Sequence, residues 1–450
     1  MKMLKWLYPG MRVKRWLSIA LAGLIIATLG IDLLTGGRLL GDFAGSVHRL
    51  EEGFIANGSR WIAGILVVTS GGAIMVIGLL IVFHSIAAVL LPEQKGGMAD
   101  FIYARRNLMR GPKIVVIGGG TGLSVLLRGL KEYTSNLTAI VTVSDDGGSS
   151  GRLRGELGIL PPGDIRNCLV ALADKEPLME ELLQYRFSTG ELAGHCMGNL
   201  LLAALTRVSG GFDLAVRGLS KVLAVRGQVL PATLSDVTLC AELVDGTVIQ
   251  GESNISQSPG QIKKIFTRPH RCLPLAEALA AIKEADAVVL GPGSLYTSII
   301  PNLLVKGIPE ALDRTPAIKI YVCNIMTQPC ETGGYSGSAH LRAIIAHGGK
   351  FLDYALVNTG RVPARLRARY RQEGADPVLA DWGEMKKLGI AAVGEDLVHQ
   401  TEVVRHHPDK LAQAILRLVF SDNDLYEKIR FLHMRQKFDR DHELSDAKIY

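Results

Sequence analysis

The chain has 450 residues, 48% of them hydrophobic, and a mean hydropathy of +0.23. This composition is too apolar for an ordinary soluble protein of this length, and it fits a soluble domain joined to a few membrane spans. The formal net charge is +7, and only 6% of the residues are aromatic. Because no segment interleaves basic with aromatic residues, a surface that stacks nucleic-acid bases is not expected, and no nucleic-acid partner is predicted.

Two apolar segments near the N-terminus predict membrane spans. Residues 61–92 contain no Asp, Glu, Lys or Arg, and a helical span needs about 20 predominantly apolar residues. A shorter apolar run, residues 16–31, ends at Asp32. A signal peptide is the alternative for this run, but no cleavage motif follows it. We therefore predict a membrane anchor in residues 1–112, with transmembrane helices at about 16–34 and 61–91 that form a helical hairpin.

The distribution of basic residues predicts which side of the membrane each part occupies. Basic residues without acidic ones precede the first span, and a second basic group follows the second span; the two groups are Lys2, Lys5, Arg12, Lys14 and Arg15, and Lys95, Arg105, Arg106, Arg110 and Lys113. Cytoplasmic loops are enriched in Lys and Arg. We therefore expect a multi-pass protein of the cell membrane with both termini and the main domain in the cytoplasm, and with Asp32 near the opposite interface.

From residue 113 onward the pattern becomes that of an α/β domain. An apolar run over residues 113–118 predicts a strand, a helix is expected at 125–133, and a second strand at 137–143. This strand, glycine loop, helix and strand predict a Rossmann-like doubly wound parallel sheet over residues 113–420. Further strands are expected at 287–290, 317–323 and 354–358, and further helices at 200–205, 274–285, 339–347 and 409–420. The charged residues 421–450 predict a peripheral helix or tail.

The first candidate site is the glycine-rich loop after the first strand, which consists of Gly118, Gly119, Gly120, Thr121 and Gly122. Glycines at this place let backbone N–H groups approach phosphate oxygens, and the N-terminus of the following helix adds partial positive charge. The loop lacks the last glycine of the dinucleotide fingerprint and the Gly-Lys-Ser/Thr of a P-loop. It predicts a phosphate cradle, with a tight turn that binds nothing as the alternative.

A pair of acidic residues, Asp145 and Asp146, follows the second predicted strand. Ligands of parallel sheets bind beyond the carboxyl ends of the strands, so these carboxylates could accept ribose hydroxyls or hold a hydrated Mg²⁺ ion. A solvated turn is the alternative. Small polar residues follow two later strands in the same way: Gly291, Gly293 and Ser294 after one, and Asn324 and Thr327 after the next. Several such loops at one sheet edge predict a pocket.

Two further polar segments complete the candidate site. Asp164, Arg166 and Asn167 follow a rigid Pro-Pro-Gly turn; the Arg166 guanidinium could grip a phosphate or could pair internally with Asp164. Asn199 lies at the start of an apolar helix, where it could bind an anion or cap the helix. His195 has no partner at metal-ligand spacing, so no metal role is expected for it.

The cysteine pattern favours reduced, mostly buried thiols. No pair has the C-x-x-C spacing, and all six cysteines follow the apolar segments. Neither a disulfide framework nor a structural zinc site is expected.

The strings Gly118–Ser124, Asp145–Arg154, Gly158–Asn167, Gly291–Ser298 and Met326–Pro329 resemble those of the YvcK-like gluconeogenesis factors. More distantly, they are similar to the CofD enzymes, which are 2-phospho-L-lactate transferases. The resemblance covers residues 113–419 and implies a Rossmann-like domain that binds UDP-sugars, notably UDP-N-acetylglucosamine. It also implies a link to peptidoglycan precursor supply and cell shape during gluconeogenic growth.

The resemblance further implies that Arg405 binds the ligand. Cys330 and Ala339 stand where the family usually has glycine and aspartate, which argues against a catalytic role for that loop.

Three functions are compatible with these residues. The first is a UDP-sugar-binding regulator of cell-wall precursor synthesis that acts on a partner enzyme, without catalytic residues. The second is a CofD-type transferase that moves a phospholactyl-like group from a nucleotide donor, with Mg²⁺ held by Asp145 and Asp146. The third, an NAD-dependent oxidoreductase, ranks last because no acid/base pair for hydride transfer is apparent. The sequence leaves the protein partner and a homo-oligomeric state open.

Overall fold

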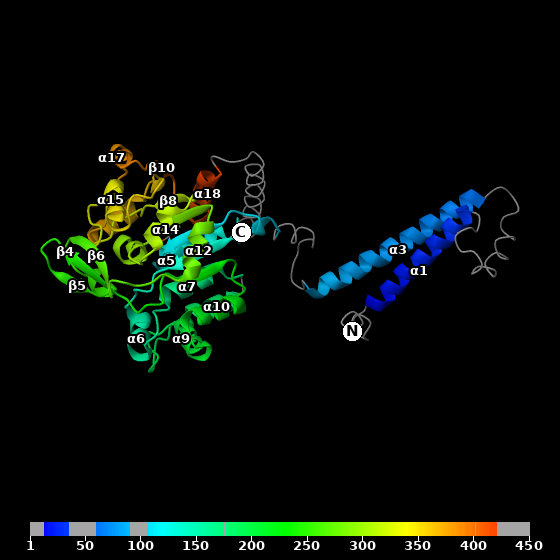
Figure 1. The fold of residues 1–450 in the computed structure, drawn as a ribbon, viewed down its shortest axis with the longest axis horizontal. Coiled ribbons are helices and arrows are strands. Elements are labelled where there is room, and N and C mark those ends of the chain that lie inside the picture. Colours follow the sequence, from blue (N-terminus) through cyan, green and yellow to red (C-terminus); the bar gives the residue numbers. More distant parts are fainter. Residues whose placement is uncertain (1–12, 36–59, 91–105, 175–176, 401, 421–450) are drawn as a thin grey trace. The chain divides into compact units, whose positions relative to one another are not determined.

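The computed structural model describes residues 13–35, 60–90, 106–174, 177–400 and 402–420. The chain divides into two compact units, residues 1–104 and 105–450, and each is described by itself. Figure 1 shows a pair of helices in the first unit and a mixed α/β body in the second. The predicted C-terminal tail, residues 421–450, lies outside the described residues.

The first unit is a hairpin of two apolar helices, α1 (Val13–Thr35) and α3 (Arg60–Leu90). Glycines bring their backbones into contact: a Cβ atom at Gly71 would lie 2.4 Å from the backbone nitrogen of Ala27. Such close approach is how transmembrane helices pack. Both helices are long and apolar enough to cross a membrane, which indicates membrane association, and the predicted spans fall on them. Large apolar side chains on the outer faces include Leu21, Ile25, Leu66, Leu80 and Phe83.

The second unit is built on a seven-stranded parallel sheet with the order β10-β9-β8-β7-β1-β2-β3. The strands are β1 (Ile114–Gly118), β2 (Leu137–Val141), β3 (Gln228–Pro231), β7 (Ala287–Leu290), β8 (Ile318–Val322), β9 (Tyr354–Asn358) and β10 (Ala391–Glu395). The central strands β1 and β7 are buried at every position. Continuous Val/Ile runs are typical of parallel strands covered on both faces, and the predicted Rossmann-like sheet is confirmed.

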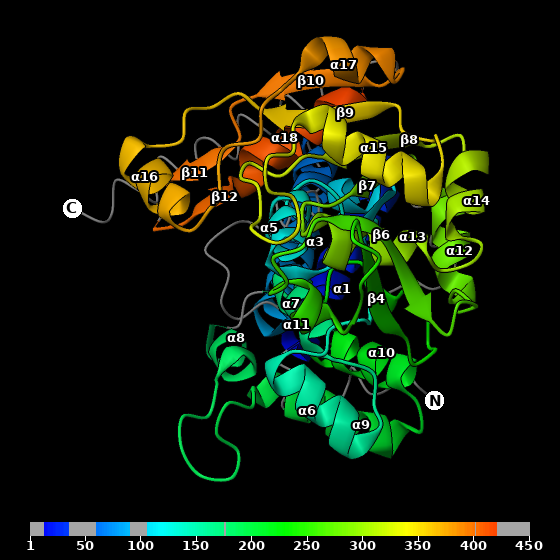
Figure 2. The ribbon, with the colours of Figure 1, turned by 90° about the vertical axis from the view of Figure 1, so that its left-hand side faces the viewer.

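Helices cover both sides of this sheet (Figure 2). On one side α5 packs against α7 and α18, and on the other α12 packs against α14 and α13 against α15. Their bounds are α5 (Gly120–Leu130), α7 (Gly163–Leu172), α12 (Ala276–Glu284), α13 (Ile300–Leu303), α14 (Ile308–Arg314), α15 (Gly337–Gly348) and α18 (Pro408–Val419). The loops at the carboxyl ends of the central strands therefore lie between two helical layers.

Helix α5 begins earlier than the sequence indicates. The helix was expected from residue 125, after a long glycine loop, but it begins at Gly120. Gly119 is extended and Gly120 has a φ of +69°, so the turn from strand to helix takes only these two residues. Glycine tolerates positive φ without strain. Thr121 and Gly122 therefore lie in the first helical turn rather than in a loop.

Several elements had no counterpart in the sequence prediction. A three-stranded antiparallel sheet joins β4 (Thr238–Leu243), β5 (Val248–Gln250) and β6 (Ile262–Arg268), and a hairpin pairs β11 (Val398–Gln400) with β12 (Val404–His406). These strands are short and carry charged residues, so their apolar pattern is weak. The remaining helices are α6 (Gly148–Leu157), α8 (Pro177–Gln184), α9 (Met197–Ser209), α10 (Phe212–Val222), α11 (Glu252–Ile255), α16 (Ala364–Gln372), α17 (Trp382–Lys387) and a π-helical turn (Leu295–Ile299).

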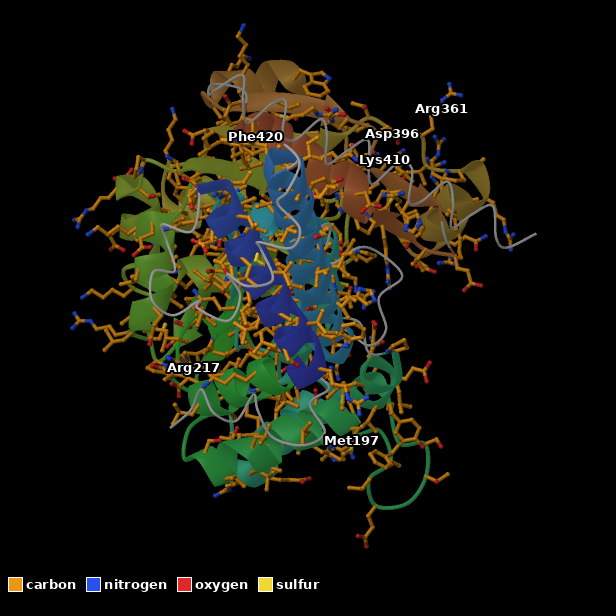
Figure 3. All side chains as sticks on the ribbon, turned by 90° about the vertical axis from the view of Figure 1, so that its right-hand side faces the viewer. Met197, Arg217, Arg361, Asp396, Lys410 and Phe420 are labelled. Atoms are coloured by element: carbon orange, nitrogen blue, oxygen red, sulfur yellow. The ribbon has the colours of Figure 1, made fainter. Side chains whose placement is uncertain are left out.

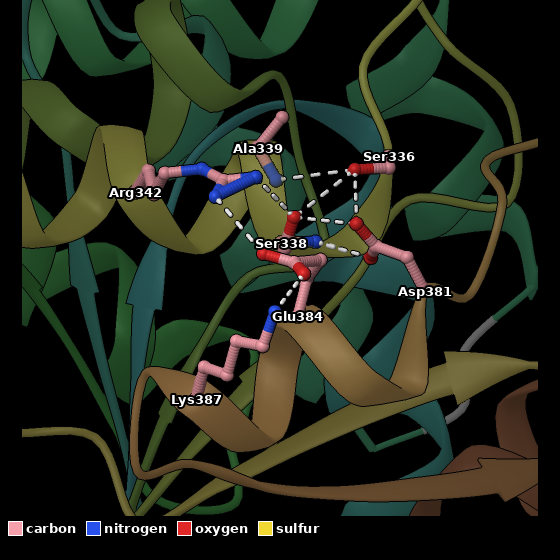
Figure 4. Close-up of polar contacts among 7 residues, drawn as sticks. All are labelled: Ser336, Ser338, Ala339, Arg342, Asp381, Glu384 and Lys387. Carbon is pink, nitrogen blue, oxygen red and sulfur yellow. Dashed lines mark hydrogen bonds and ion pairs between the residues drawn. The ribbon is translucent and has the colours of Figure 1, made fainter.

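A polar network joins the start of α15 to the start of α17 (Figure 4). The Asp381 carboxylate accepts hydrogen bonds from the backbone N–H and hydroxyl of Ser338 and from the hydroxyl of Ser336. The serines and the nearby His340 do not form a nucleophilic relay, because the His340 Nδ1 atom lies 2.8 Å from the backbone oxygen of Ser336. A carboxylate at a helix N-terminus is stabilising, so this network stabilises the contact between α15 and α17.

Candidate ligand-binding site

A cavity of about 410 Å³ opens at the carboxyl ends of β1, β7 and β8. Five segments line it. They are the start of α5 (Gly120, Thr121, Gly122, Val125), the segment after β7 (Pro292, Gly293, Ser294, Ser298), the loop after β8 (Asn324, Ile325, Met326, Thr327, Gln328, Pro329), the end of α16 and the residues after it (Tyr370, Glu373, Ala375), and β12 with the residue before it (Val403, Val404, Arg405, His406). Its position matches the general rule that ligands of open parallel sheets bind beyond the strand ends.

The absence of a side chain at Gly122 lets the first turn of α5 and the loop after β7 approach each other closely. A Cβ atom at Gly122 would lie only 2.7 Å from the carbonyl oxygen of Pro292. Amide side chains then hold the next loop in place: Asn324 donates to the carbonyl of Gly293 at 2.9 Å, and Gln328 donates to the Ser294 hydroxyl at 2.7 Å. The cavity wall thus consists of backbone turns that hydrogen bonds hold together.

The positive charge of the cavity comes from one side chain and one helix end. Arg405 is the only Lys or Arg among the lining residues, and it is exposed. The N-terminus of α5 presents the backbone N–H groups of its first turn; its N-cap residue Gly119 has no side chain to cap them, and the Asp164 carboxylate accepts the N–H of Gly120. His406 adds no charge at neutral pH, because burial lowers its pKa to about 4. A helix N-terminus together with an arginine is a chemistry that suits phosphate.

A second polar region lies on the other side of the glycine turn and is rich in acids. We call it the acidic cluster, and it consists of Asp145, Asp146, Asp164, Glu252 and Glu331. Burial, and to a lesser degree the charge of Asp145, raises the pKa of Asp164 to about 6, although the N–H of Gly120 opposes the shift. Burial and the neighbouring carboxylates raise the pKa of Glu252 to about 7. Burial, with repulsion from neighbouring carboxylates, therefore lets Asp164 and Glu252 hold a proton at a higher pH than usual.

Asp146 is committed to a structural contact. Its two carboxylate oxygens accept the backbone N–H groups of Glu252 at 3.0 Å and Ser253 at 2.9 Å, which caps the short helix α11. Asp145 accepts the N–H of Gly147 at 2.9 Å. Among the described residues, no three acids, histidines or cysteines are arranged to hold a metal ion. The Mg²⁺ role that the sequence suggests for Asp145 and Asp146 stays a prediction.

The polar residues around Arg166 form a buried hydrogen-bonded group. Arg166 donates to the side-chain oxygens of Asn199 at 3.0 Å and Asn167 at 2.7 Å. The internal ion pair with Asp164, one of the sequence alternatives, is absent from the described residues. Capping by Asn199 is also wrong: Cys196 is the N-cap of α9, and Asn199 lies inside its first turn. His195 contacts the Ser149 hydroxyl through Nδ1 at 3.2 Å.

The structure brings only part of the predicted site into one cavity. Of the predicted ligand-binding residues, those that line it are Gly120, Thr121, Gly122, Gly293, Ser294, Asn324, Thr327 and Arg405. Those that do not line it are Gly118, Gly119, Asp145, Asp146, Asp164, Arg166, Asn167, Asn199 and Gly291. Within the second set, Asp164 packs against the glycine turn: a Cβ atom at Gly119 would lie 2.6 Å from its Oδ2 atom.

Sequence reasoning missed several lining residues, notably Ser298, Gln328, Tyr370, Glu373 and His406. Gln328 lies in a recognisable motif, Met326–Pro329, and His406 follows Arg405, so these two could have been found. Tyr370 and Glu373 lie in an arginine-rich segment without a glycine loop or strand signal, and nothing in the sequence points to them.

A Rossmann-like sheet with a glycine turn and a cavity at its carboxyl edge defines the class of this protein. The family model for 2-phospho-L-lactate transferase CofD matches residues 114–398. The chain belongs to the gluconeogenesis factor family, whose members share this CofD-type domain.

Relatives of two lengths match the chain. A protein of Nostoc sp. is 49% identical over 425 residues, which cover 92% of each chain. The gluconeogenesis factor of Bacillus subtilis is 51% identical over 311 residues, which are 68% of this chain and 98% of its own. A crystal structure of a Bacillus halodurans protein superposes with a TM-score of 0.67 at 51% identity and covers 68% of this chain and 99% of that one. The longer relatives thus extend over most of the chain, while the shorter ones match about two thirds.

Proposed function

We propose that the α/β unit binds a UDP-sugar, with UDP-N-acetylglucosamine as the first candidate. The observation that carries this proposal is one cavity lined by both the N-terminal turn of α5 and Arg405, the only Lys or Arg of its lining. These two features provide for a diphosphate. Small polar side chains such as Ser294, Asn324 and Gln328 provide hydrogen-bond partners for a sugar. A cavity of about 410 Å³ has the size of common small-molecule sites.

In this proposal the protein is a regulator rather than an enzyme. The titratable residues of the lining are few: Glu373, Tyr370, Arg405 and a His406 whose lowered pKa keeps it neutral. They include no hydrogen-bonded pair of nucleophile and base of the kind that covalent catalysis uses. The ligand would report the supply of cell-wall precursors to a partner enzyme and so adjust cell shape under gluconeogenic growth. The two helices of the first unit would hold the domain at the cytoplasmic face of the membrane.

The proposal is tested by isothermal titration of the full-length protein, in detergent micelles, with UDP-N-acetylglucosamine. Saturable heat with a stoichiometry near one is the expected result, and UDP should compete. Titrations with GDP and NAD⁺ at the same concentrations test the specificity. If millimolar UDP-N-acetylglucosamine gives no heat, the proposal is wrong.

A second candidate is a CofD-type transferase, and one observation favours it. Asp164 is buried directly behind the glycine turn, and its pKa of about 6 lets it exchange a proton near neutral pH. A carboxyl group in this range is suited to general acid–base work. Incubation with GDP-linked lactyl donors and a deazaflavin acceptor should then transfer the phospholactyl group and release GMP, and Asp164→Asn should abolish the release. If no donor yields GMP, this candidate fails while the UDP-sugar proposal stands.

A further inference from the structure

We propose that the arginines of α16 and of the segment before it form an electrostatic collar that draws the anionic ligand into the cavity. The arginine collar consists of Arg361, Arg365, Arg367, Arg369 and Arg371. Its role would be to set the association rate of the ligand, while Arg405 and the N-terminus of α5 hold it once bound. This inference rests on the proposed binding of a nucleotide diphosphate.

The collar carries more positive charge than its surroundings neutralise. Arg371 pairs with Asp376 at 3.4 Å and Arg369 with Glu373 at 3.9 Å. Within the described part of the chain, the side chains of the other three collar arginines make no ion pair or hydrogen bond. All five are exposed, and Figure 3 shows Arg361 projecting outward, whereas the nearby Lys410 is paired with Asp396 at 2.8 Å.

Helix stability does not explain this concentration of arginine. None of the residues of α16 is buried, so the helix contributes no apolar face to the main core. The pairs Arg365/Arg369 and Arg367/Arg371 have the i,i+4 spacing at which like charges repel each other on a helix. Arg369 and Arg371 lie in the last turn, where cations are favourable, but Arg365 and Arg367 lie in the first turn, where acids are preferred. The charge therefore indicates a role toward something anionic outside the helix.

The position of α16 beside the cavity indicates that this anionic species is the ligand of the cavity. Tyr370 and Glu373 line the cavity, and the Arg369 guanidinium lies over the Tyr370 ring at 5.5 Å. The Tyr370 hydroxyl accepts the backbone N–H of Val404 at 3.2 Å, beside Arg405. The C-terminal end of α16 and the cation of the cavity therefore border the same opening. A cleft lined by one sign of charge raises the local concentration and the on-rate of an oppositely charged ligand.

The test measures association and dissociation rates by stopped flow, with full-length protein in detergent micelles and a UDP derivative that carries a fluorophore on its sugar end. The variant Arg365→Gln/Arg367→Gln removes two collar charges that have no partner among the described residues. The matched control, Arg271→Gln/Arg314→Gln, removes two exposed charges outside the cavity lining, so both variants have the same net charge.

The collar variant should associate about 3- to 10-fold more slowly than wild type at 20 mM salt, with an unchanged dissociation rate. The ratio of the wild-type association rate to that of the collar variant should fall toward 1 at 0.5 M salt, because salt ions screen the charges. The control should follow wild type at both salt concentrations.

Three outcomes would overturn the inference. Equal association rates for the collar variant and the control would show that position is irrelevant and only net charge counts. If the collar variant loses affinity through faster dissociation, and the loss persists at 0.5 M salt, these arginines contact the bound ligand directly and do not act as a collar. If wild type binds no UDP derivative, the nucleotide proposal itself fails and the collar loses its ligand. The last result differs from the others because it appears in wild type.

Discussion

Two polar regions, the cavity and the acidic cluster, flank the glycine turn at Gly119 and Gly120. They differ in charge and in how far their side chains are hydrogen-bonded to the backbone. The cavity lining has uncharged polar groups, one cation, Arg405, and one carboxylate, Glu373, which lies 3.9 Å from Arg369. The acidic cluster has five carboxylates, several of which are tied to backbone N–H groups. An anion approaching the turn meets attraction on the first side and repulsion on the second. Under the proposed function, the cavity binds the ligand and the acidic cluster supports the surrounding loops.

The same comparison shows what acids near a glycine turn can mean. In sequence, Asp145 and Asp146 have the features of ribose or metal ligands, since they follow a strand at the correct edge. In the structure, Asp146 replaces a helix cap for α11, which brings the antiparallel sheet against the α/β core. The predictions below separate the two roles, beginning with the variant expected to have the largest effect.

The largest effect is expected from Gly122→Ala. The new Cβ atom would lie 2.7 Å from the Pro292 carbonyl oxygen, so the loops after β1 and β7 must separate. Forcing an extra carbon into packed structure costs about 1–3 kcal/mol of unfolding free energy. The displaced cavity wall should weaken UDP-sugar binding by about 100-fold, equivalent to roughly 3 kcal/mol. Thermal denaturation and calorimetric titration measure the two effects.

Gly155→Ala is the matched control for this substitution. Gly155 lies in helix α6, and a Cβ atom there meets nothing within 4 Å. Alanine should stabilise the helix by about 0.5–1 kcal/mol and leave ligand binding unchanged. If both alanine variants bind the ligand like wild type, the close contact at Gly122 has no part in forming the site.

The next effect is expected from Arg405→Gln, which removes the only Lys or Arg side chain of the cavity lining. A hydrogen bond to a charged group is worth about 1.5–3 kcal/mol, so the dissociation constant of the UDP-sugar should rise by roughly 10- to 100-fold. The melting temperature should not change, because Arg405 is exposed. Arg314→Gln, at an exposed site on α14, should leave the affinity unchanged. Equal affinity of Arg405→Gln and wild type would remove the cation from the proposed site.

The sheet was predictable from sequence because its signals are local. The strand at Tyr354–Asn358 was located to the residue, and the other predicted strands overlap observed ones. Apolar runs that end in glycine or small polar residues mark buried parallel strands and the loops after them. The start of α5 was placed too late because glycines suggested a loop, whereas Gly122 serves close packing within a helical turn.

The complete cavity was not predictable because half of it depends on contacts between distant segments. Tyr370 reaches the site only because its hydroxyl binds Val404 on a β-hairpin that the sequence pattern did not reveal. Similarly, the commitment of Asp146 depends on the backbone of Glu252, 106 residues away. Motifs identified which loops gather at the sheet edge, but the partners of each side chain follow from the tertiary fold.

A moderate effect on stability, with little on binding, is expected from Asp146→Ala. The substitution removes the acceptor of two backbone N–H groups at the start of α11. Loss of a helix cap costs about 0.5–2 kcal/mol of unfolding free energy, which chemical denaturation can measure. The UDP-sugar affinity should stay within about twofold of wild type. Asp313→Ala, at an exposed position on α14, should change neither quantity. A large loss of affinity in Asp146→Ala at preserved stability would place Asp146 in the ligand site.

The smallest effect is expected from Glu252→Gln and depends on pH. Burial and neighbouring carboxylates raise the pKa of Glu252 to about 7, so the folded state holds this proton at pH values where the unfolded chain has released it. The folded state then binds more protons than the unfolded state between about pH 4.5 and 7, and stability falls as pH rises through this window.

Glutamine resembles the protonated form of Glu252. The variant should therefore lack the part of the stability loss at rising pH that comes from ionisation of Glu252. The variant and wild type should melt at the same temperature at pH 4, where Glu252 is protonated in both states. At pH 8 the variant should melt roughly 2 °C higher. Part of the decline below pH 6 should persist, because Asp164 keeps its raised pKa of about 6. Glu156→Gln, at an exposed site on α6, should show no such pH-dependent gap. If the Glu252 gap is constant across pH, repulsion among the carboxylates does not limit the stability of this region, and the contrast between cavity and cluster is one of hydrogen bonding alone.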